Sequence, residues 1–273
     1  MRAVLLAATM ALALPFQAVA DPARVDSLID ATRLTEVLGV MREEGLSYAE
    51  SLEADLFAGQ GGRAWMGEAD RIHALDRSLA DMRGSLTETL IEDTIDPAIA
   101  FFASPLGQKI VAAELSARAA MLDKEVDAIA SEVSAEKIAA NDPRIDALRR
   151  FIEANDLIES NVVGGLNSNF AFYRGLVDGG AFEGDITESQ MLAEVWEQEA
   201  ALRVSSEEWL LSYLGLAYSA LNDAELEAYI EMSDTEAGGA FNRAVFEAFD
   251  VLFTRTSYEL GKAAARFMTA EDA

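Results

Sequence analysis

The chain has no cysteine and a single histidine among its 273 residues. Without cysteine there is no disulfide framework, no thiol chemistry and no cysteine for lipid attachment. One histidine cannot supply the two Asp/Glu-x-x-His pairs of a di-iron helical bundle, and no Gly-x-Ser-x-Gly elbow is present for a Ser-His-Asp hydrolase. We therefore predict no catalytic residue, no metal ligand and no cofactor.

Basic residues are also scarce. Only 21 Lys and Arg stand against 48 Asp and Glu, and the formal net charge is −27. Such a surface repels nucleic acid and anionic lipid headgroups, so we predict no nucleic-acid partner. The acid excess is typical of a surface that keeps an exported protein soluble; a surface for a cation or a basic partner is the alternative.

Long apolar runs are missing except at the N-terminus. Residues 1–20 begin with a basic residue, continue with an apolar stretch and end in Ala18-Val19-Ala20. This pattern predicts a secretory signal peptide cleaved after Ala20. Pro15 interrupts the run short of the roughly 20 apolar residues of a membrane span. We expect no transmembrane segment and a periplasmic protein, or a secreted one.

Alternating strand patterns bounded by turns are absent, and the apolar residues recur at helical spacing. The stripes include Leu106, Ile110, Ala113, Ala117 and Met121, and Phe241, Val245, Phe249, Leu252, Thr256 and Leu260. Helix-start signals are Asp96-Pro97, Asp142-Pro143, Thr187-x-x-Gln190, Ser205-x-x-Glu208 and Asn222-x-x-Glu225. The sequence predicts an all-α helical bundle of about ten helices.

One corner is encoded in detail. Pro105 pushes Ser104 out of the helical region, so a first helix ends at Ala103 and Ser104 becomes the N-cap of the next. Gly107 has no Cβ, which lets the two helices approach closely. An anion site at the exposed helix-start amides is the alternative, with Lys109 as its only nearby cation.

The run AFFASPLGQKIVAAELSARAAM resembles the helix pair of an uncharacterised bacterial family, domain of unknown function 2059. The match rests on Phe101, Phe102, Ser104, Pro105, Gly107 and Gln108. The resemblance implies a helical, exported bacterial protein and brings no activity or catalytic residue with it.

The two halves of the chain look like diverged copies of one helical unit, residues 21–135 and 136–273. Val25-Asp26-Ser27-Leu28 matches Ile145-Asp146-Ala147-Leu148, and Gly45-Leu46-Ser47 matches Gly165-Leu166-Asn167 at the same offset. We expect the copies to share one core about a pseudo-twofold axis. The alternatives are chance similarity of Ala-rich helices, or two independent bundles linked at 135–142.

His73 lies between Asp70 and Asp76, which could hold a metal or tune an imidazole. The neighbouring Arg71 and Arg77 instead favour a solvated helix face. Three tryptophans, at positions 65, 196 and 209, have the spacing of core residues.

One polar helical segment, 161–173, suggests the wall of a groove. Its candidate residues are Asn161, Gly164, Gly165, Asn167, Asn169, Phe172 and Tyr173. If the halves are copies, the counterpart around 41–53 should form the other wall.

These observations predict an exported, non-catalytic helical protein that binds a partner protein, a peptide or a small apolar ligand in the cell envelope. The alternative is a carboxylate-based hydrolase that uses a divalent cation. Two buried carboxylates about 5–10 Å apart in a cleft would favour the hydrolase. Neither the identity of a ligand or partner nor an oligomeric state follows from the sequence.

Overall fold

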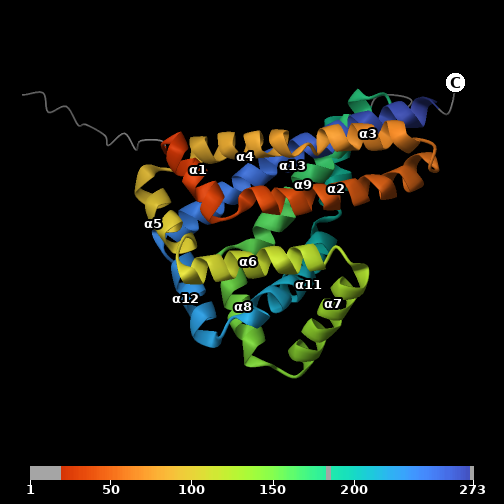
Figure 1. Ribbon diagram of the computed structural model, residues 1–273. Helices are drawn as coiled ribbons and strands as arrows, with labels where there is room; N and C mark the ends of the chain where they lie inside the picture. Colours follow the sequence, from red (N-terminus) through yellow and green to blue (C-terminus); the bar gives the residue numbers. More distant parts are fainter. Residues whose placement is uncertain (1–19, 183–185, 271–273) are drawn as a thin grey trace, which may run out of the picture.

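A computed structural model describes residues 20–182 and 186–270, and these residues fold almost entirely into α-helices (Figure 1). The helices are α1 Pro22–Ala31, α2 Leu34–Phe57, α3 Gly62–Ile72, α4 Leu75–Thr89, α5 Glu92–Phe102, α6 Pro105–Ala120, α7 Lys124–Ala139, α8 Pro143–Ala154, α9 Leu157–Asp178, α10 Glu188–Trp196, α11 Glu199–Ala217, the 3₁₀ turn η1 Tyr218–Ala220, α12 Asp223–Ser233 and α13 Glu236–Ala270. The all-α prediction is confirmed. The signal peptide predicted over residues 1–20 lies, up to residue 19, outside the described residues.

Three of the predicted helix starts are confirmed by their caps. The Asp142 carboxylate accepts the amide of Arg144 at 2.9 Å, ahead of Pro143. Thr187 with Gln190, and Asn222 with Glu225, form complete capping boxes. Side-chain acceptors at these positions satisfy amides that a helix start leaves free.

Two predicted starts are wrong. Pro97 lies inside α5, which begins five residues earlier at Glu92; the buried face made by Thr94, Ile95 and Ala98 keeps the helix continuous despite the missing amide hydrogen. Ser205 lies inside α11, where its hydroxyl donates back to the Leu202 carbonyl. Local cap signals were overridden there by packing.

In the described residues, two breaks raise the number of helices somewhat above the figure of about ten that the sequence predicts. The chain breaks between α3 and α4 at His73–Ala74, and between α10 and α11 at Glu197–Gln198. Neither break contains glycine or proline, the residues that usually indicate a helix end in a sequence, so the sequence does not predict these breaks.

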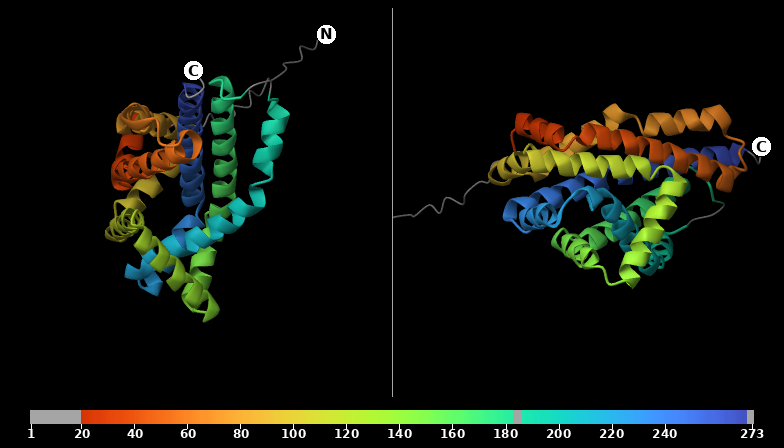
Figure 2. Two further views of the ribbon diagram at one scale, coloured as in Figure 1. Left: turned by 90° about the vertical axis from the view of Figure 1, so that its right-hand side faces the viewer. Right: turned by 60° about the horizontal axis from the view of Figure 1, so that its bottom comes forward.

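The 35 residues of α13 make it about 52 Å long, and it runs through the middle of the molecule (Figure 1). Helix α9 lies beside it, as the left view of Figure 2 shows. Helices α2, α3 and α4 pack against α13. Helices α8 and α11 contact α9, and α12 contacts α13. This arrangement leaves α9 and α13 as the shared centre of the bundle.

Glycine sets the close contact of α9 and α13. A Cβ at Gly175 would lie 2.2 Å from the Tyr258 carbonyl oxygen, and one at Gly261 would lie 2.2 Å from the Phe172 carbonyl oxygen. Both distances are far below van der Waals contact, so the two backbones touch only because these side chains are missing. The two glycines therefore fix the position of α9 against α13.

The main hydrophobic cluster draws buried residues from both halves of the chain, from α1, α2, α4, α5 and α6 as well as α8, α11, α12 and α13. A second cluster surrounds Trp65, which is fully buried and donates its indole N–H to the Ala49 carbonyl at 2.8 Å. The core placement expected for the tryptophans holds for this one only: Trp196 is 69% exposed and Trp209 is 38% exposed.

Within each half, helices at equivalent places along the chain pack on one another. Helix α1 packs on α4 and α5, and α8 packs on α11 and α12; across the halves, α4 contacts α13 and α11 contacts α6. Arg33, between α1 and α2, has a left-handed backbone conformation with φ 51°. Asp156, between α8 and α9, has the same conformation with φ 50°.

Within the described residues, no single helix has the length and apolarity of a membrane-crossing segment. Helices α5 and α6 reach those values only when taken together, across a bend of 80°.

Candidate functional site

A cleft of about 930 Å³ lies beside α9 and α13. Its walls come from α2, α6, α8, α9, α11, α12 and α13. The cleft therefore uses helices from both halves of the chain.

Five of the seven groove residues predicted on α9 line this cleft: Asn161, Gly164, Gly165, Asn167 and Asn169. The other two do not. Phe172 and Tyr173 pack against the cluster around Trp65, because the turn of α9 that carries them faces the far end of α13. The predicted segment therefore extends one turn too far toward the C-terminus.

The wall opposite includes Met41 and Tyr48 from α2. These positions lie in the segment 41–53 that was expected to face the α9 segment. Asn161 and Ser168, 120 residues further along, line the cleft from α9.

The polar asparagines of α9 are already used within the protein. Asn167 donates to the Asp250 carboxylate at 2.9 Å, Asn169 donates to the Gln198 side chain at 2.7 Å, and Asn161 donates to the Leu157 carbonyl at 2.7 Å. They hold the wall in place, and their carbonyl oxygens remain as acceptors.

A cluster that we term the polar floor contains Glu114 on α6, Tyr213 on α11, Tyr218 on η1 and Tyr229 on α12, all of which line the cleft. The Tyr218 hydroxyl donates to the Glu114 carboxyl at 2.6 Å, and the Tyr213 hydroxyl donates to the Glu114 backbone carbonyl at 3.2 Å. Burial raises the pKa of the Glu114 carboxyl to about 7, against the lowering effect of hydrogen bonds from Tyr218 and Tyr229.

The rim of the cleft is apolar and open to solvent. Four large side chains on four helices are exposed there: Tyr48 (54%), Val163 (47%), Trp209 (38%) and Phe253 (38%). Trp209 stacks on Tyr213 with ring centroids 4.9 Å apart, which links the rim to the polar floor. Exposed apolar groups that gather at a hollow are typical of a binding site.

The charges that line the cleft are unbalanced. Arg118 is the only basic residue among the described lining residues, and Glu44 binds it bidentately at 2.9 and 2.7 Å. The acidic lining residues are Glu114, Asp156, Glu159, Glu247 and Asp250. The cleft is therefore negative.

The Ser-Pro-x-Gly-Gln corner is a structural joint. Ser104 accepts the Gly107 amide at 3.1 Å, and Pro105 begins α6, as expected. A Cβ at Gly107 would lie 2.2 Å from the Phe101 carbonyl oxygen. Gln108 donates to the carbonyls of Ala31 at 2.7 Å and of Phe102 at 2.8 Å, which closes the ends of α1 and α5.

The corner between α12 and α13 has the same geometry with different residues. Thr235 accepts the Gly238 amide at 3.0 Å, and a Cβ at Gly238 would lie 2.1 Å from the Met232 carbonyl oxygen. The close approach of the two helices is thus kept without the proline.

His73 does not lie on a solvated helix face, and that interpretation is wrong. It ends α3, and its ring packs so closely on α2 that a Cβ at Gly45 would lie 2.5 Å from it. The buried Nε2 atom has no hydrogen-bond partner among the described residues. Burial, with Arg255 and Arg42 nearby, lowers the pKa of His73 to about 4, so the ring is neutral at pH 7.

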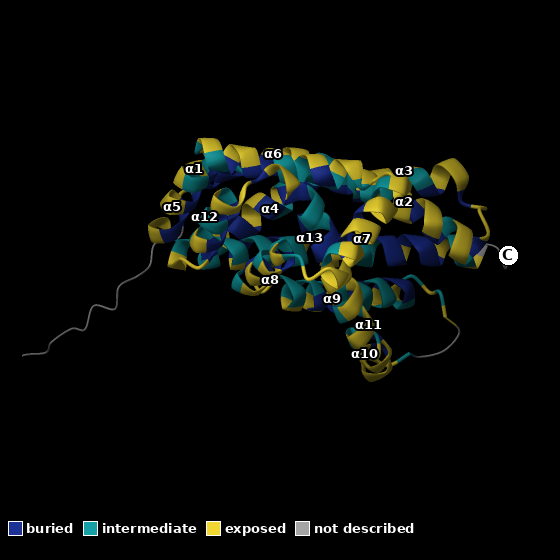
Figure 3. Ribbon diagram, turned by 90° about the horizontal axis from the view of Figure 1, so that it is seen from below, coloured by how far each residue is buried: buried dark blue, intermediate teal, exposed yellow. Residues whose placement is uncertain are grey.

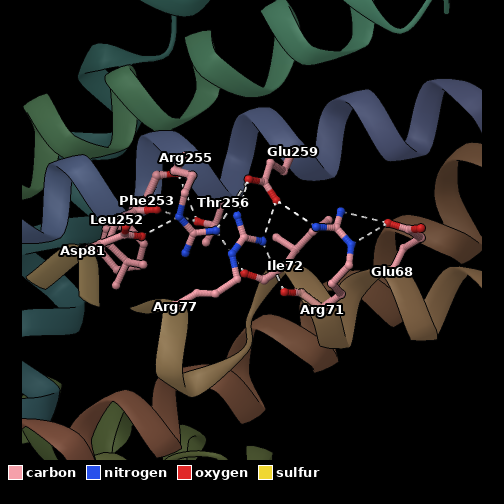
Figure 4. Close-up of polar contacts among 10 residues, drawn as sticks. All are labelled: Glu68, Arg71, Ile72, Arg77, Asp81, Leu252, Phe253, Arg255, Thr256 and Glu259. Carbon is pink, nitrogen blue, oxygen red and sulfur yellow. Dashed lines mark hydrogen bonds and ion pairs between the residues drawn. The ribbon is translucent and has the colours of Figure 1, made fainter. Parts of the chain in front are cut away.

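An ion-pair network next to His73 joins α3 and α4 to α13 (Figure 4). The Glu259 carboxylate accepts two hydrogen bonds from Arg77, at 3.0 and 2.7 Å, and lies 3.7 Å from the Arg71 guanidinium. Arg255 pairs with Asp81 and lies 3.8 Å from Glu259. The hydrogen bonds from Arg77 lower the pKa of Glu259. The network holds these helices together.

The described residues contain no group of three or more His, Cys, Asp or Glu arranged to hold a metal ion. Sequence reasoning missed the polar floor, because Glu114 is one of 48 acidic residues and only the fold gathers three tyrosines around it.

Residues 79–136 match the model of a family described as an uncharacterized protein conserved in bacteria, DUF2059. The matched segment runs from α4 into α7 and contains the corner, so the resemblance carried by Ser104 to Gln108 is confirmed over those residues. It also contains Glu114 and Arg118, whereas the tyrosines of the polar floor lie outside it. No curated protein and no solved structure matches the chain.

Proposed function

We propose that the protein is an exported, non-catalytic binding protein of the cell envelope, and that its cleft takes a small ligand with a mainly apolar body. The cleft carries this proposal. Its volume of about 930 Å³ lies within the range of about 300–1,000 Å³ that is usual for small-molecule sites. Aromatic and aliphatic side chains make up most of its lining surface, and its polar groups are the polar floor, the asparagines of α9 and the acidic residues named above.

The exposed rim supports the same proposal. Tyr48, Val163 and Phe253 would bury apolar surface on a ligand that enters between α2, α9 and α13. By contrast, α10 projects from the rest of the bundle (Figure 3), and its exposed Leu192 and Trp196 do not line the cleft.

We also propose that residues 21–135 and 136–273 are diverged copies of one six-helix unit, α1 to α6 and α8 to α13. The shared packing order, the left-handed residues Arg33 and Asp156, and the glycine corners at Gly107 and Gly238 support this proposal. On this view α2 and α9 are equivalent helices, and the cleft has formed between them.

The hydrolase alternative would use Glu114, whose raised pKa suits a general acid. A carboxylate mechanism needs a second carboxyl group held near the first. Asp156, Glu159 and Glu247 are exposed, and Asp250 accepts a hydrogen bond from Asn167. These surroundings favour binding over hydrolysis.

Native mass spectrometry of the protein isolated from its own cell envelope tests ligand binding directly. A retained mass of a few hundred daltons that disappears on unfolding is the expected result. In vitro, titration with the neutral fluorophore N-phenyl-1-naphthylamine should give saturable fluorescence enhancement, because the probe buries its rings in the cleft.

A matched pair of variants locates the probe. A Cβ at Gly164 or at Gly84 would meet no atom within 4 Å, so both positions accept a larger side chain, but only Gly164 lines the cleft. Gly164→Trp should abolish the fluorescence enhancement, and Gly84→Trp should leave it unchanged. Equal binding to both variants would overturn the proposal.

Export is tested by the N-terminus of the protein in its own cells. The signal pattern predicts that the protein recovered from the envelope fraction begins at Asp21. Intact-mass measurement of a chain that still begins at Met1, found only in the cytoplasmic fraction, would contradict export.

A further inference from the structure

We propose that the ligand of the cleft is an organic cation, with an amine or quaternary ammonium head held at Glu114 and an apolar body along the aromatic walls. This inference rests on the proposed binding function and adds the chemical class of the ligand. It follows from the shape of the cleft, the charges that line it and the groups around one carboxyl.

Among the described residues, no basic side chain forms an ion pair with the Glu114 carboxyl. The single basic lining residue, Arg118, is one helical turn away on α6 and is held bidentately by Glu44. A carboxylate in such a place is costly to ionise, because it loses water and gains no cation. A cationic ligand would supply the missing charge.

Three aromatic rings of the cleft wall pack on one another, and two of them, Tyr218 and Tyr229, contact Glu114. Phe151 and Tyr229 have ring centroids 4.8 Å apart, Phe151 and Tyr218 are 5.4 Å apart, and Tyr218 and Tyr229 are 6.0 Å apart. The negative faces of such rings attract ammonium groups, and this attraction grows when water is excluded. Hydrogen bonds from the Tyr218 and Tyr229 hydroxyls occupy part of the acceptor capacity of the carboxyl, whose two oxygens offer about four acceptor sites, so sites remain for an N–H donor.

The outer part of the cleft favours the same class of ligand. Asp156 and Glu247 line it and are exposed, while the third exposed acid there, Glu159, pairs with Arg203 at 2.8 Å. Charges of one sign around a hollow raise the local concentration of the opposite ion and speed its association. A fatty acid or another anion would meet the carboxyl at the floor and these charges at the rim.

Three ligands that share an eight-carbon tail separate the possibilities: octyltrimethylammonium, 1-octanol and octanoate. Isothermal titration calorimetry at pH 8 in 0.15 M salt should show the cation binding about tenfold more tightly than 1-octanol, with octanoate weakest. Gly164→Trp should abolish binding of all three.

Glu114→Gln should weaken octyltrimethylammonium binding about tenfold and leave 1-octanol binding unchanged, since only the charge is removed. Glu88→Gln is the matched control: it removes an exposed charge on α4 that does not line the cleft, and it should change affinity by less than about twofold in 0.15 M salt. Retained 1-octanol binding shows that the Glu114→Gln variant is folded.

The pH dependence gives a second measurement on the unaltered protein. The groups that face Glu114 are Arg118 on its own helix, Glu44 on α2, and Tyr213, Tyr218 and Tyr229. The pKa of each of these tyrosines is raised by burial, so they stay neutral near pH 7. Binding of octyltrimethylammonium should therefore weaken as the pH falls from 8 to 6, while 1-octanol binding stays constant.

The outcomes separate the two proposals. If 1-octanol or octanoate binds as tightly as the cation, and Gly164→Trp still abolishes that binding, the binding function stands and the cation inference fails. If Glu114→Gln leaves the cation affinity unchanged, the inference also fails. If none of the three ligands binds, the proposed binding function itself is overturned.

Discussion

The corner between α5 and α6 gives the sharpest test of the packing argument. Alanine at position 107 would place its Cβ 2.2 Å from the Phe101 carbonyl oxygen and 2.5 Å from the Phe102 Cα, and both atoms belong to the backbone of α5. Ordinary contact begins at 3.4 Å, so the two helices would have to separate by about 1 Å. Overpacking of this kind costs about 1–3 kcal/mol.

The same substitution at Gly164 removes a glycine from the middle of α9 without a clash, since a Cβ there would meet no atom within 4 Å. Alanine should stabilise that site by about 0.5–1 kcal/mol. Pro105→Ala should change stability by less than about 0.5 kcal/mol, because a proline at the first helical position mainly preorganises the chain.

Urea unfolding of the three variants, followed by circular dichroism, measures these differences. We expect Gly107→Ala to be less stable than Gly164→Ala by about 1.5–4 kcal/mol, the sum of the two effects, with unchanged m-values. For a domain of this size, each kcal/mol of lost stability lowers Tm by about 2–4 °C. A Gly107→Ala variant as stable as Gly164→Ala would refute the close-packing explanation of the corner.

Three further predictions follow from the shared core and the titratable groups. Expressed separately, residues 21–135 and 136–273 should each fail to melt cooperatively, whereas the chain that holds both should melt in one transition; two independent cooperative melts would contradict the shared core. The folded pKa of His73 lies below its unfolded value, so only the unfolded chain gains a proton between pH 6.5 and 4, and stability should fall by up to about 3 kcal/mol as the pH is lowered through that window. His73→Leu should remove this part of the pH dependence in urea unfolding, and an unchanged pH profile would argue against the neutral buried ring. The pKa of Glu259 is lowered in the folded state, so Glu259→Gln should cost on the order of 1 kcal/mol at pH 7, a difference that closes as the pH falls below about 4 and that thermal melts would detect.

Local chemistry made part of the fold predictable. The caps at Asp142, Thr187 and Asn222 lie where the sequence places them, because each side chain satisfies amides only a few residues away. The corner at Ser104 was predictable for the same reason. Such signals act within one turn of helix and need no knowledge of the neighbouring helices.

Tertiary placement was less predictable. The apolar stripe of α13 is uniform in sequence, yet Leu252 and Leu260 are buried in the core while Phe241 and Val245 line the cleft. Periodicity identifies the apolar face of a helix but not what covers it. Glu114 was missed for a related reason: its three tyrosine neighbours are about 100 or more residues away in the chain.

Helix α13 also determines when the molecule can fold. It follows the other described helices in the chain and is therefore synthesised after them, and it supplies Leu252 to the main cluster and Leu260 to the cluster around Trp65. Helices α2, α3 and α4, made near the beginning, have to wait for it, because their apolar faces pack on α13. Contacts between such distant parts of a chain form slowly. The full core therefore closes only after α13 has been synthesised, and until then the apolar faces of α2, α3 and α4 lack their partner on α13.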